Sequence, residues 1–156
     1  MNGNLVIRSA AADDIDRIFE LLEIYAAQKV VLARSKEDIA FYIGNFTVAE
    51  CDGRVCGCVA VRDFGNDLLE IRSLVVDPEM QNCGVGKAMI NAIVEKVKSS
   101  RQYWRLFALT LRPDFFISLG FKEVPRALFP EKIWSDCLKC SKLNCCDETA
   151  LLMESE

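Results

Sequence analysis

The sequence contains no histidine, which excludes Ser-His-Asp triads, imidazole bases and histidine metal ligands. Any proton transfer must therefore use a carboxylate, lysine, tyrosine, cysteine or water. The chain also lacks a surplus of basic residues, because 19 Lys and Arg stand against 23 Asp and Glu, for a net charge of −4. Contacts to nucleic-acid phosphates require a surplus of positive charge, so no nucleic-acid partner is expected.

Long apolar runs are absent as well, and none approaches the roughly 20 residues that span a bilayer. Residues 1–8 have neither the basic lead nor the apolar core of a signal peptide. We therefore expect a soluble, cytoplasmic protein with no membrane partner. What is present is ordinary for a globular chain, since 51% of the 156 residues are apolar and 27% are charged. This length and composition predict one domain, 1–156.

Eight cysteines are present, and without a signal peptide they indicate reduced thiols rather than a disulfide scaffold. Four stand singly and are predicted to be small buried hydrophobes: Cys51, Cys56, Cys58 and Cys83. The other four lie in a Cys-rich insertion at about 130–147, before the last strand: Cys137, Cys140, Cys145 and Cys146. A zinc knuckle is one interpretation of this cluster. Structural zinc sites normally use two separated pairs, so packing thiols are preferred and no metal is predicted.

Hydrophobic periodicity and turn signals predict an α/β domain with a mixed sheet. Strands are expected at 5–8, 46–50, 55–62, 68–76, 106–110, 121–127 and 149–153, with a hairpin turn at Asp52-Gly53. Helices are expected after a cap at Asp13 or Asp14, after Ser35, after the glycines of 84–86, and from Pro113 to Gly120. The order is strand, two helices, three strands, helix, strand, helix, two strands. It predicts six to seven strands flanked by four helices.

The segment 81–87, between a strand and an amphipathic helix, carries two glycines. Glycine lets the backbone approach a ligand closely, and the unpaired amides of a first helical turn attract phosphate. The spacing fits neither a Walker loop nor a dinucleotide fingerprint. Taken alone, such a segment is more often a plain turn.

The neighbouring residues give this loop a context. Arg72-Ser73-Leu74-Val75-Val76-Asp77-Pro78, followed by Gln81-x-x-Gly84-x-Gly86, resembles the acetyl-CoA signature of the GNAT N-acetyltransferase superfamily. The predicted element order is also that of the GNAT fold. The resemblance implies that acetyl-CoA is the co-substrate. It also implies that Leu74, Val75 and Val76 line the pantetheine arm, and that Gln81, Asn82, Cys83, Gly84, Val85, Gly86 and Lys87 hold the pyrophosphate.

Glu70 and Arg72 interrupt an otherwise apolar strand. Alternation places them on one face with Leu74 and Val76, opposite Leu69, Ile71 and Val75. An ion pair at the sheet margin is the common explanation. By its resemblance to the GNAT strand glutamate, Glu70 is instead the candidate base that deprotonates the acceptor amine. The usual GNAT acid, a tyrosine, is replaced by Phe116, which leaves the general acid open. A thiol with a pKa of about 8.5 is a tolerable leaving group.

Four stretches resemble the short, single-domain amino-acid N-acetyltransferases of the N-acetylglutamate synthase type, which serve arginine biosynthesis: 31–35, 70–74, 108–116 and 130–137. The resemblance implies transfer of acetyl to the α-amine of L-glutamate by direct attack on the thioester. Arg34, Arg72 and Lys132 are the candidate receptors for its two carboxylates, although each alone would pass for a surface charge.

Two alternatives remain open at this stage. One is a GNAT enzyme that acts on another small amine or on a protein amino terminus. The other is an acyl-CoA-binding regulatory module without catalysis. The assembly is open as well, and a homodimer is compatible with the sequence.

Overall fold

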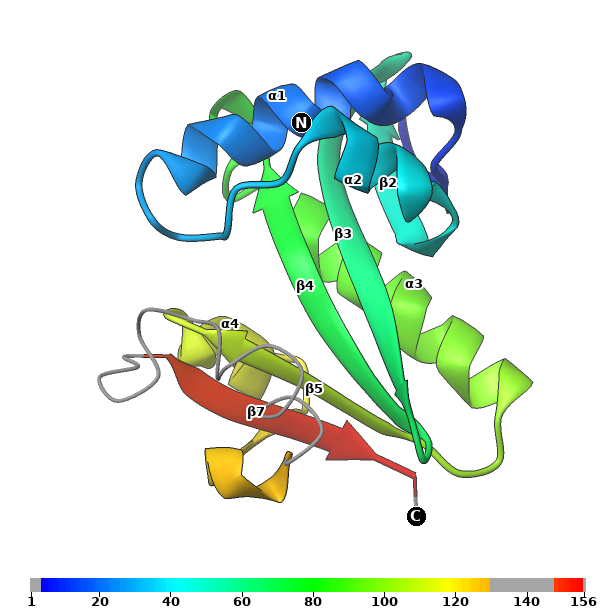
Figure 1. The fold of residues 1–156 in the computed structure, drawn as a ribbon, viewed down its shortest axis with the longest axis vertical. Helices are drawn as coiled ribbons and strands as arrows, with labels where there is room; N and C mark the ends of the chain where they lie inside the picture. The colour runs from blue at the N-terminus through cyan, green and yellow to red at the C-terminus, as the bar shows by residue number, and fades with distance from the viewer. Residues whose placement is uncertain (1–3, 130–147, 156) are drawn as a thin grey trace. The chain divides into compact units, whose positions relative to one another are not determined.

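The computed structural model describes residues 4–129 and 148–155. Seven strands hydrogen-bond in the order β1-β2-β3-β4-β5-β7-β6. They are β1 (Leu5–Ser9), β2 (Phe46–Cys51), β3 (Arg54–Gly65), β4 (Leu68–Val76), β5 (Arg105–Thr110), β6 (Lys122–Val124) and β7 (Thr149–Glu154). The helices are α1 (Ile15–Ala26), α2 (Lys36–Phe41), α3 (Val85–Ser100) and α4 (Pro113–Ser118) (Figure 1). The predicted fold class and element order are confirmed. Within the described part of the chain, no helix is long and apolar enough to cross a membrane.

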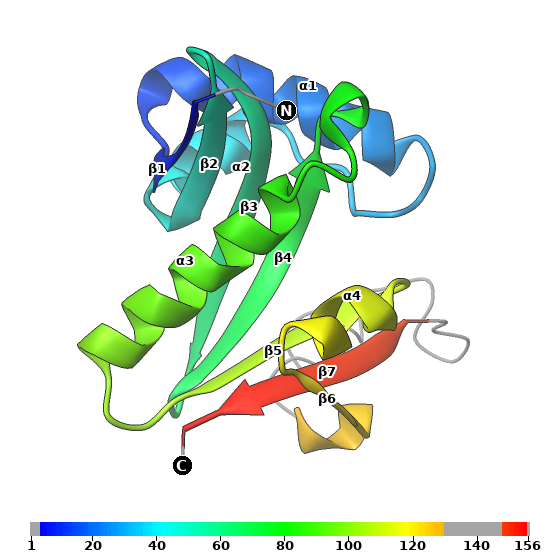
Figure 2. The same cartoon turned by 180° about the vertical axis from the view of Figure 1, so that it is seen from behind.

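The chain folds as two compact units, of which the first comprises Met1–Val61 and Arg72–Ser99. Its strands β1, β2 and β3 pair antiparallel, and the Asp52-Gly53 hairpin turn has the positive φ angles that such turns require, 52° and 82°. Helices α1 and α2 cover one face of these strands and α3 covers the other (Figures 1 and 2). The apolar stripe of α1 supplies Ile18, Leu21 and Leu22 to the core. Ser35 caps α2 by accepting a hydrogen bond from the Asp38 amide at 3.0 Å.

The second unit comprises Arg62–Ile71 and Ser100–Glu156. The first three residues of β4 pair in parallel with β5, and β7 pairs antiparallel with both β5 and β6. Its core includes Leu68, Phe107 and Phe129. The rings of Phe107 and Phe129 stack with their centroids 4.1 Å apart. The predicted strand 121–127 is wrong beyond Val124. Pro125 has no amide to donate, so the strand ends there and a 3₁₀ turn follows at Arg126–Leu128.

A charged network holds the start of α1 against the first two strands. Asp14 is buried, and both of its carboxylate oxygens accept from the Arg8 guanidinium, at 2.8 and 3.0 Å. The Ala11 amide donates to the same carboxylate at 2.8 Å. Arg8 Nε donates in turn to Glu50 of β2, at 2.7 Å. The hydrogen bonds from Arg8 lower the pKa of Asp14 below its ordinary value.

Replacing Asp14 with asparagine removes that carboxylate, so we expect the free energy of unfolding at pH 7 to fall by about 2 kcal/mol. Because the folded-state pKa of Asp14 is lowered, this stability is present above the unfolded-state pKa of about 3.9. It is lost as the pH falls through the folded-state pKa. Urea unfolding of both proteins should therefore show a smaller difference at pH 3 than at pH 7. An equal difference at both pH values would contradict the assignment.

Candidate active site

Strand β4 carries the predicted base. Glu70 is only 3% exposed, and its neighbours Leu69 and Ile71 are buried too. It lies on a central strand, between β3 and β5, and in parallel register with Phe107 of β5. Glu70 is thus an interior carboxylate rather than one at the sheet margin. Arg72, two residues further on, is half-buried.

The backbone of β4 changes direction at Ser73, whose φ angle is 55°. A left-handed conformation within a strand costs a non-glycine residue about 1–3 kcal/mol and persists only where the surroundings hold it. Two contacts hold it here: Arg34 Nη1 donates to the Ser73 hydroxyl at 3.3 Å, and the Cys58 thiol donates to the Ser73 carbonyl at 3.6 Å. The strict alternation predicted along this strand is interrupted at Ser73. Serine has no preference for this conformation, so the sequence carried no signal of it.

Arg34 reaches β4 from the segment between α1 and α2. Its Nε donates to the Asp38 carboxylate at 2.6 Å, and its guanidinium lies over the Phe46 ring, 5.0 Å from the centroid. The side chain is 12% exposed. Among the residues that the structure describes, Arg34 Nη2 has no hydrogen-bond partner. Arg34 therefore lies beside Ser73, the residue that follows Arg72. Lys132, the third predicted receptor, lies outside the described residues.

The predicted pyrophosphate loop leads into helix α3. Asn82 and Gly84 adopt φ angles of 62° and 80°, and the first helical hydrogen bond runs from the Ala88 amide to the Gly84 carbonyl, at 3.0 Å. The amides of residues 85–87 therefore precede the first bond within the helix and carry the positive end of its dipole. A Cβ at Gly84 would meet no heavy atom within 4 Å. This open backbone suits a phosphate or pyrophosphate group.

The side chains of the predicted cofactor residues differ in exposure. Val75 and Val85 are buried, so only their backbone can face a ligand. Leu74, Val76 and Gly86 are half-buried, whereas Gln81, Asn82, Cys83, Gly84 and Lys87 are exposed. The amide side chain of Gln81 turns back toward β4 and donates to the Val76 carbonyl at 3.2 Å. Its backbone and the residues after it are left to face a ligand.

The four described cysteines are free thiols. Cys56 and Cys58 are buried, as predicted, and burial raises the pKa of the Cys58 thiol to about 12. The prediction is wrong for Cys83, which is exposed because it lies in the open loop, and Cys51 is half-buried. Cys137, Cys140, Cys145 and Cys146 lie outside the described residues.

Gly57 of β3 is a positioning residue that the sequence did not reveal. A Cβ there would lie 2.9 Å from Met89 Cε, 3.1 Å from the Val75 carbonyl oxygen and 3.2 Å from Val85 Cγ1. Only glycine lets the first turns of α3 pack this closely on the strands. The N-terminus of α3 is thereby held near the end of β4. A glycine inside an apolar strand was the only available signal.

Phe116, at the position of the usual acid, is buried in the second unit. Its ring packs edge-to-face on Phe115 and Phe121, with centroids 5.1 and 5.3 Å away. It serves the core and cannot donate a proton.

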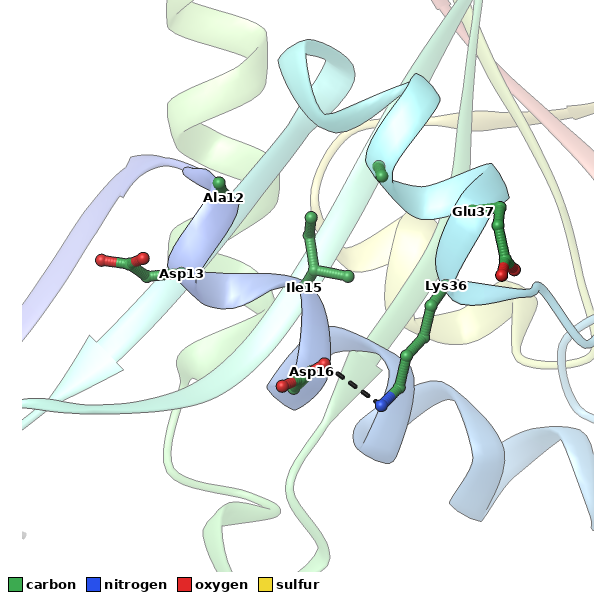
Figure 3. A pocket seen from close by; sticks show the side chains of 7 residues that line it. Ala12, Asp13, Ile15, Asp16, Lys36 and Glu37 are labelled. Carbon is green, nitrogen blue, oxygen red and sulfur yellow. Dashed lines mark ion pairs between the residues drawn. The ribbon is translucent and has the colours of Figure 1, made fainter.

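A shallow hollow of about 540 Å³ lies at the starts of α1 and α2 (Figure 3). It is lined by Ala12, Asp13, Ile15, Asp16, Lys36, Glu37 and Ala40. Lys36 reaches across it to Asp16, with Nζ and Oδ1 3.1 Å apart (Figure 3). The hollow shares no residue with the candidate site.

Comparison with known proteins agrees with this geometry. Residues 42–123 match the acetyltransferase (GNAT) domain. An uncharacterised N-acetyltransferase of Chlorobaculum tepidum is 39% identical over 94% of this chain and 94% of its own. The chain therefore belongs to the GNAT family of acetyltransferases, and it is an N-acetyltransferase.

Other relatives are more specific. The amino-acid acetyltransferase of Mycobacterium tuberculosis is 34% identical over 76% of this chain and 69% of its own. The structure of N-acetylglutamate synthase from Neisseria gonorrhoeae, complexed with coenzyme A and N-acetyl-glutamate, superposes with a TM-score of 0.86 and 28% identity. It covers 100% of this chain, which spans only 36% of the gonococcal one. Coenzyme A in that complex agrees with the co-substrate expected from the sequence, acetyl-CoA.

Gly84 allows a direct test of the predicted pyrophosphate loop. Alanine at this position strains the backbone, because φ is 80°, and it adds a methyl group where a pyrophosphate would approach. We expect the KM for acetyl-CoA to rise about tenfold or more while the protein stays folded. Steady-state kinetics with acetyl-CoA as the varied substrate measures this.

Gly65→Ala is the matched control. Gly65 has a φ angle of 83° and equally open surroundings, but it lies before the opposite end of β4. The Gly65→Ala variant should lose about as much stability as Gly84→Ala, but its KM for acetyl-CoA should stay unchanged. Equal KM values in both variants would remove the loop from the cofactor site.

Proposed function

We propose that this protein transfers the acetyl group of acetyl-CoA to the α-amine of an amino acid, that the amino acid is L-glutamate, and that the reaction serves arginine biosynthesis. Several relatives carry the name amino-acid acetyltransferase, and the gonococcal structure holds N-acetyl-glutamate. The observation that carries the proposal is the position of the Arg34 guanidinium. The guanidinium donates a hydrogen bond to Ser73. Ser73 follows Arg72 on β4, the strand that also carries Glu70.

A dicarboxylate with one free amine needs cationic receptors, and arginine is the best of them. Asp38 and Phe46 hold the Arg34 guanidinium in one orientation, which lowers the entropy lost when a carboxylate binds. Arg72 is the second receptor in this proposal, and Lys132, outside the described residues, is the third. Neutral amino acids would leave at least one of these cations without its partner, which costs affinity.

Bound acetyl-CoA supplies an electrophilic thioester carbonyl and a thiolate leaving group. The chain's own contribution begins at the loop, where the amides of residues 85–87 and the Lys87 ammonium would neutralise the pyrophosphate. Leu74, Val75 and Val76 would line the arm, with Val75 contributing backbone only. Glu70 would accept a proton from the acceptor ammonium, directly or through water, and leave the amine free to attack.

Arg34→Ala should raise the KM for glutamate about 30-fold or more, and far more than it raises the KM for acetyl-CoA. Removal of one member of a partly buried charge pair typically has an effect of that size. Kinetics with glutamate, glutamine, leucine and a short peptide measures both the specificity and the role of Arg34.

Because Arg34 also holds Ser73, Arg34→Lys is needed as a second variant beside Arg34→Ala. It keeps the charge but loses the planar fork, so it should recover only part of the affinity for glutamate. A wild-type preference for leucine or the peptide would overturn the glutamate assignment while the acetyltransferase activity stands.

Glu70→Gln keeps the shape of the side chain and removes the base. We expect kcat at pH 7 to fall about 100-fold, the lower end of the range for general-base catalysis. The deficit should shrink as the pH rises, because the free amine then forms without the enzyme's help. A pH profile of kcat for both proteins tests this. A loss of the same size at every pH would assign Glu70 to positioning or folding instead.

A further inference from the structure

The Tyr25 side chain, in the last turn of α1, contacts the predicted pyrophosphate loop at Gln81. The Tyr25 hydroxyl donates to the Val76 carbonyl at 2.5 Å, and Gln81 Nε2 donates to the same hydroxyl oxygen at 2.5 Å. Gln81 also donates to the Val76 carbonyl, at 3.2 Å. These three groups close a ring of hydrogen bonds that joins the end of β4 to the first residue of the predicted pyrophosphate loop.

The backbone at Tyr25 is fixed as firmly as its hydroxyl. The Tyr25 carbonyl accepts from the amides of Gln28 and Val30, at 3.1 and 3.0 Å, and the Lys29 amide donates to the Ala26 carbonyl at 3.0 Å. With Lys29 at a φ angle of 61°, this is the pattern of a Schellman motif, which ends the helix at a defined residue. Tyr25 therefore stands at a fixed point from which its ring can reach the loop.

The same helix holds the other end of the segment between β4 and the loop. Arg17 donates to the Asp77 carboxylate at 2.5 Å and to the Val55 carbonyl at 2.9 Å. Asp77 in turn accepts from the Glu79 amide at 2.9 Å and donates its own amide to the Cys56 carbonyl at 2.7 Å. Arg17 thus holds this segment at Asp77 and Tyr25 holds it at Gln81.

We propose that Tyr25 is a positioning residue for the pyrophosphate-binding loop and acts through Gln81 and the Val76 carbonyl. The proposal rests on the proposed function, since it takes residues 81–87 as the loop that binds the co-substrate. Gln81 is exposed, and its side chain loses conformational entropy when held back against β4. The Tyr25 hydroxyl and the Val76 carbonyl together hold it there, so that the residues after Gln81 present their amides in one arrangement before the ligand arrives.

Tyr25→Phe removes the hydroxyl and keeps the ring. We expect the KM for acetyl-CoA to rise roughly three- to tenfold, the effect of one neutral hydrogen bond, with kcat and the KM for glutamate unchanged. Gln81→Met, at an exposed position and therefore safe for folding, should give a rise of similar size. In the double variant the rise should be smaller than the product of the two single effects, because both remove parts of one network.

Direct binding separates this proposal from the function on which it rests. Calorimetry should show weaker binding of coenzyme A and of 3′-phospho-ADP to Tyr25→Phe, whereas pantetheine should bind as it does to the wild type. Tyr103→Phe is the matched control, because Tyr103 is exposed in the second unit, and it should bind all three probes normally.

If the wild type binds no coenzyme A, the proposed function fails. If the wild type binds it and Tyr25→Phe binds it equally well, only the role of Tyr25 fails. Fully multiplicative effects in the double variant, or a fall in kcat with unchanged KM for acetyl-CoA, would overturn that role as well.

Discussion

The left-handed backbone of Ser73 is the constraint on which the rest of the site depends. A strand that kept its regular geometry would present Arg72 and Leu74 in simple alternation and would need no support from neighbouring elements. The strained residue persists because Arg34 bonds its hydroxyl and Cys58 bonds its carbonyl. Arg34 is fixed in its turn by Asp38 and Phe46. Arg34, the side chain proposed to receive a substrate carboxylate, is therefore also part of the support that shapes the strand.

A second constraint is the close packing of α3 on the strands. The chain is acidic as a whole, with a net charge of −4, yet its proposed ligands are anions. Overall charge would repel them weakly, and dissolved salt at about 0.1 M screens such repulsion beyond about 10 Å. Oriented amides at short range matter more, because they need no counter-charge and lose little entropy on binding. Gly57 allows the amide-bearing end of α3 to lie against Val75, so the absence of one Cβ sets where the anion site can form.

The element order followed from the sequence because its signals were local. Periodic apolar residues, the Asp52-Gly53 turn and Pro113 each act within a few residues, and each lies where expected. The missed features depend on contacts between distant segments. Ser73 adopts its conformation through Arg34 and Cys58, and Tyr25 of α1 reaches Val76 and Gln81. Cys83 was expected to be buried because cysteine usually is, but loop geometry decided its exposure.

The lack of histidine leaves few groups near β4 that can move a proton. Cys58 is unsuited to it, because burial raises the pKa of its thiol to about 12 and its proton is shared with the Ser73 carbonyl. Phe116 has no proton to give. Among the described residues of β4, the buried Glu70 carboxylate is the group proposed to accept the proton of the amine. The departing thiolate has an ordinary pKa of about 8.5, so water can protonate it after the bond breaks. A leaving group with this pKa does not require a general acid, so the phenylalanine at position 116 is compatible with acetyl transfer.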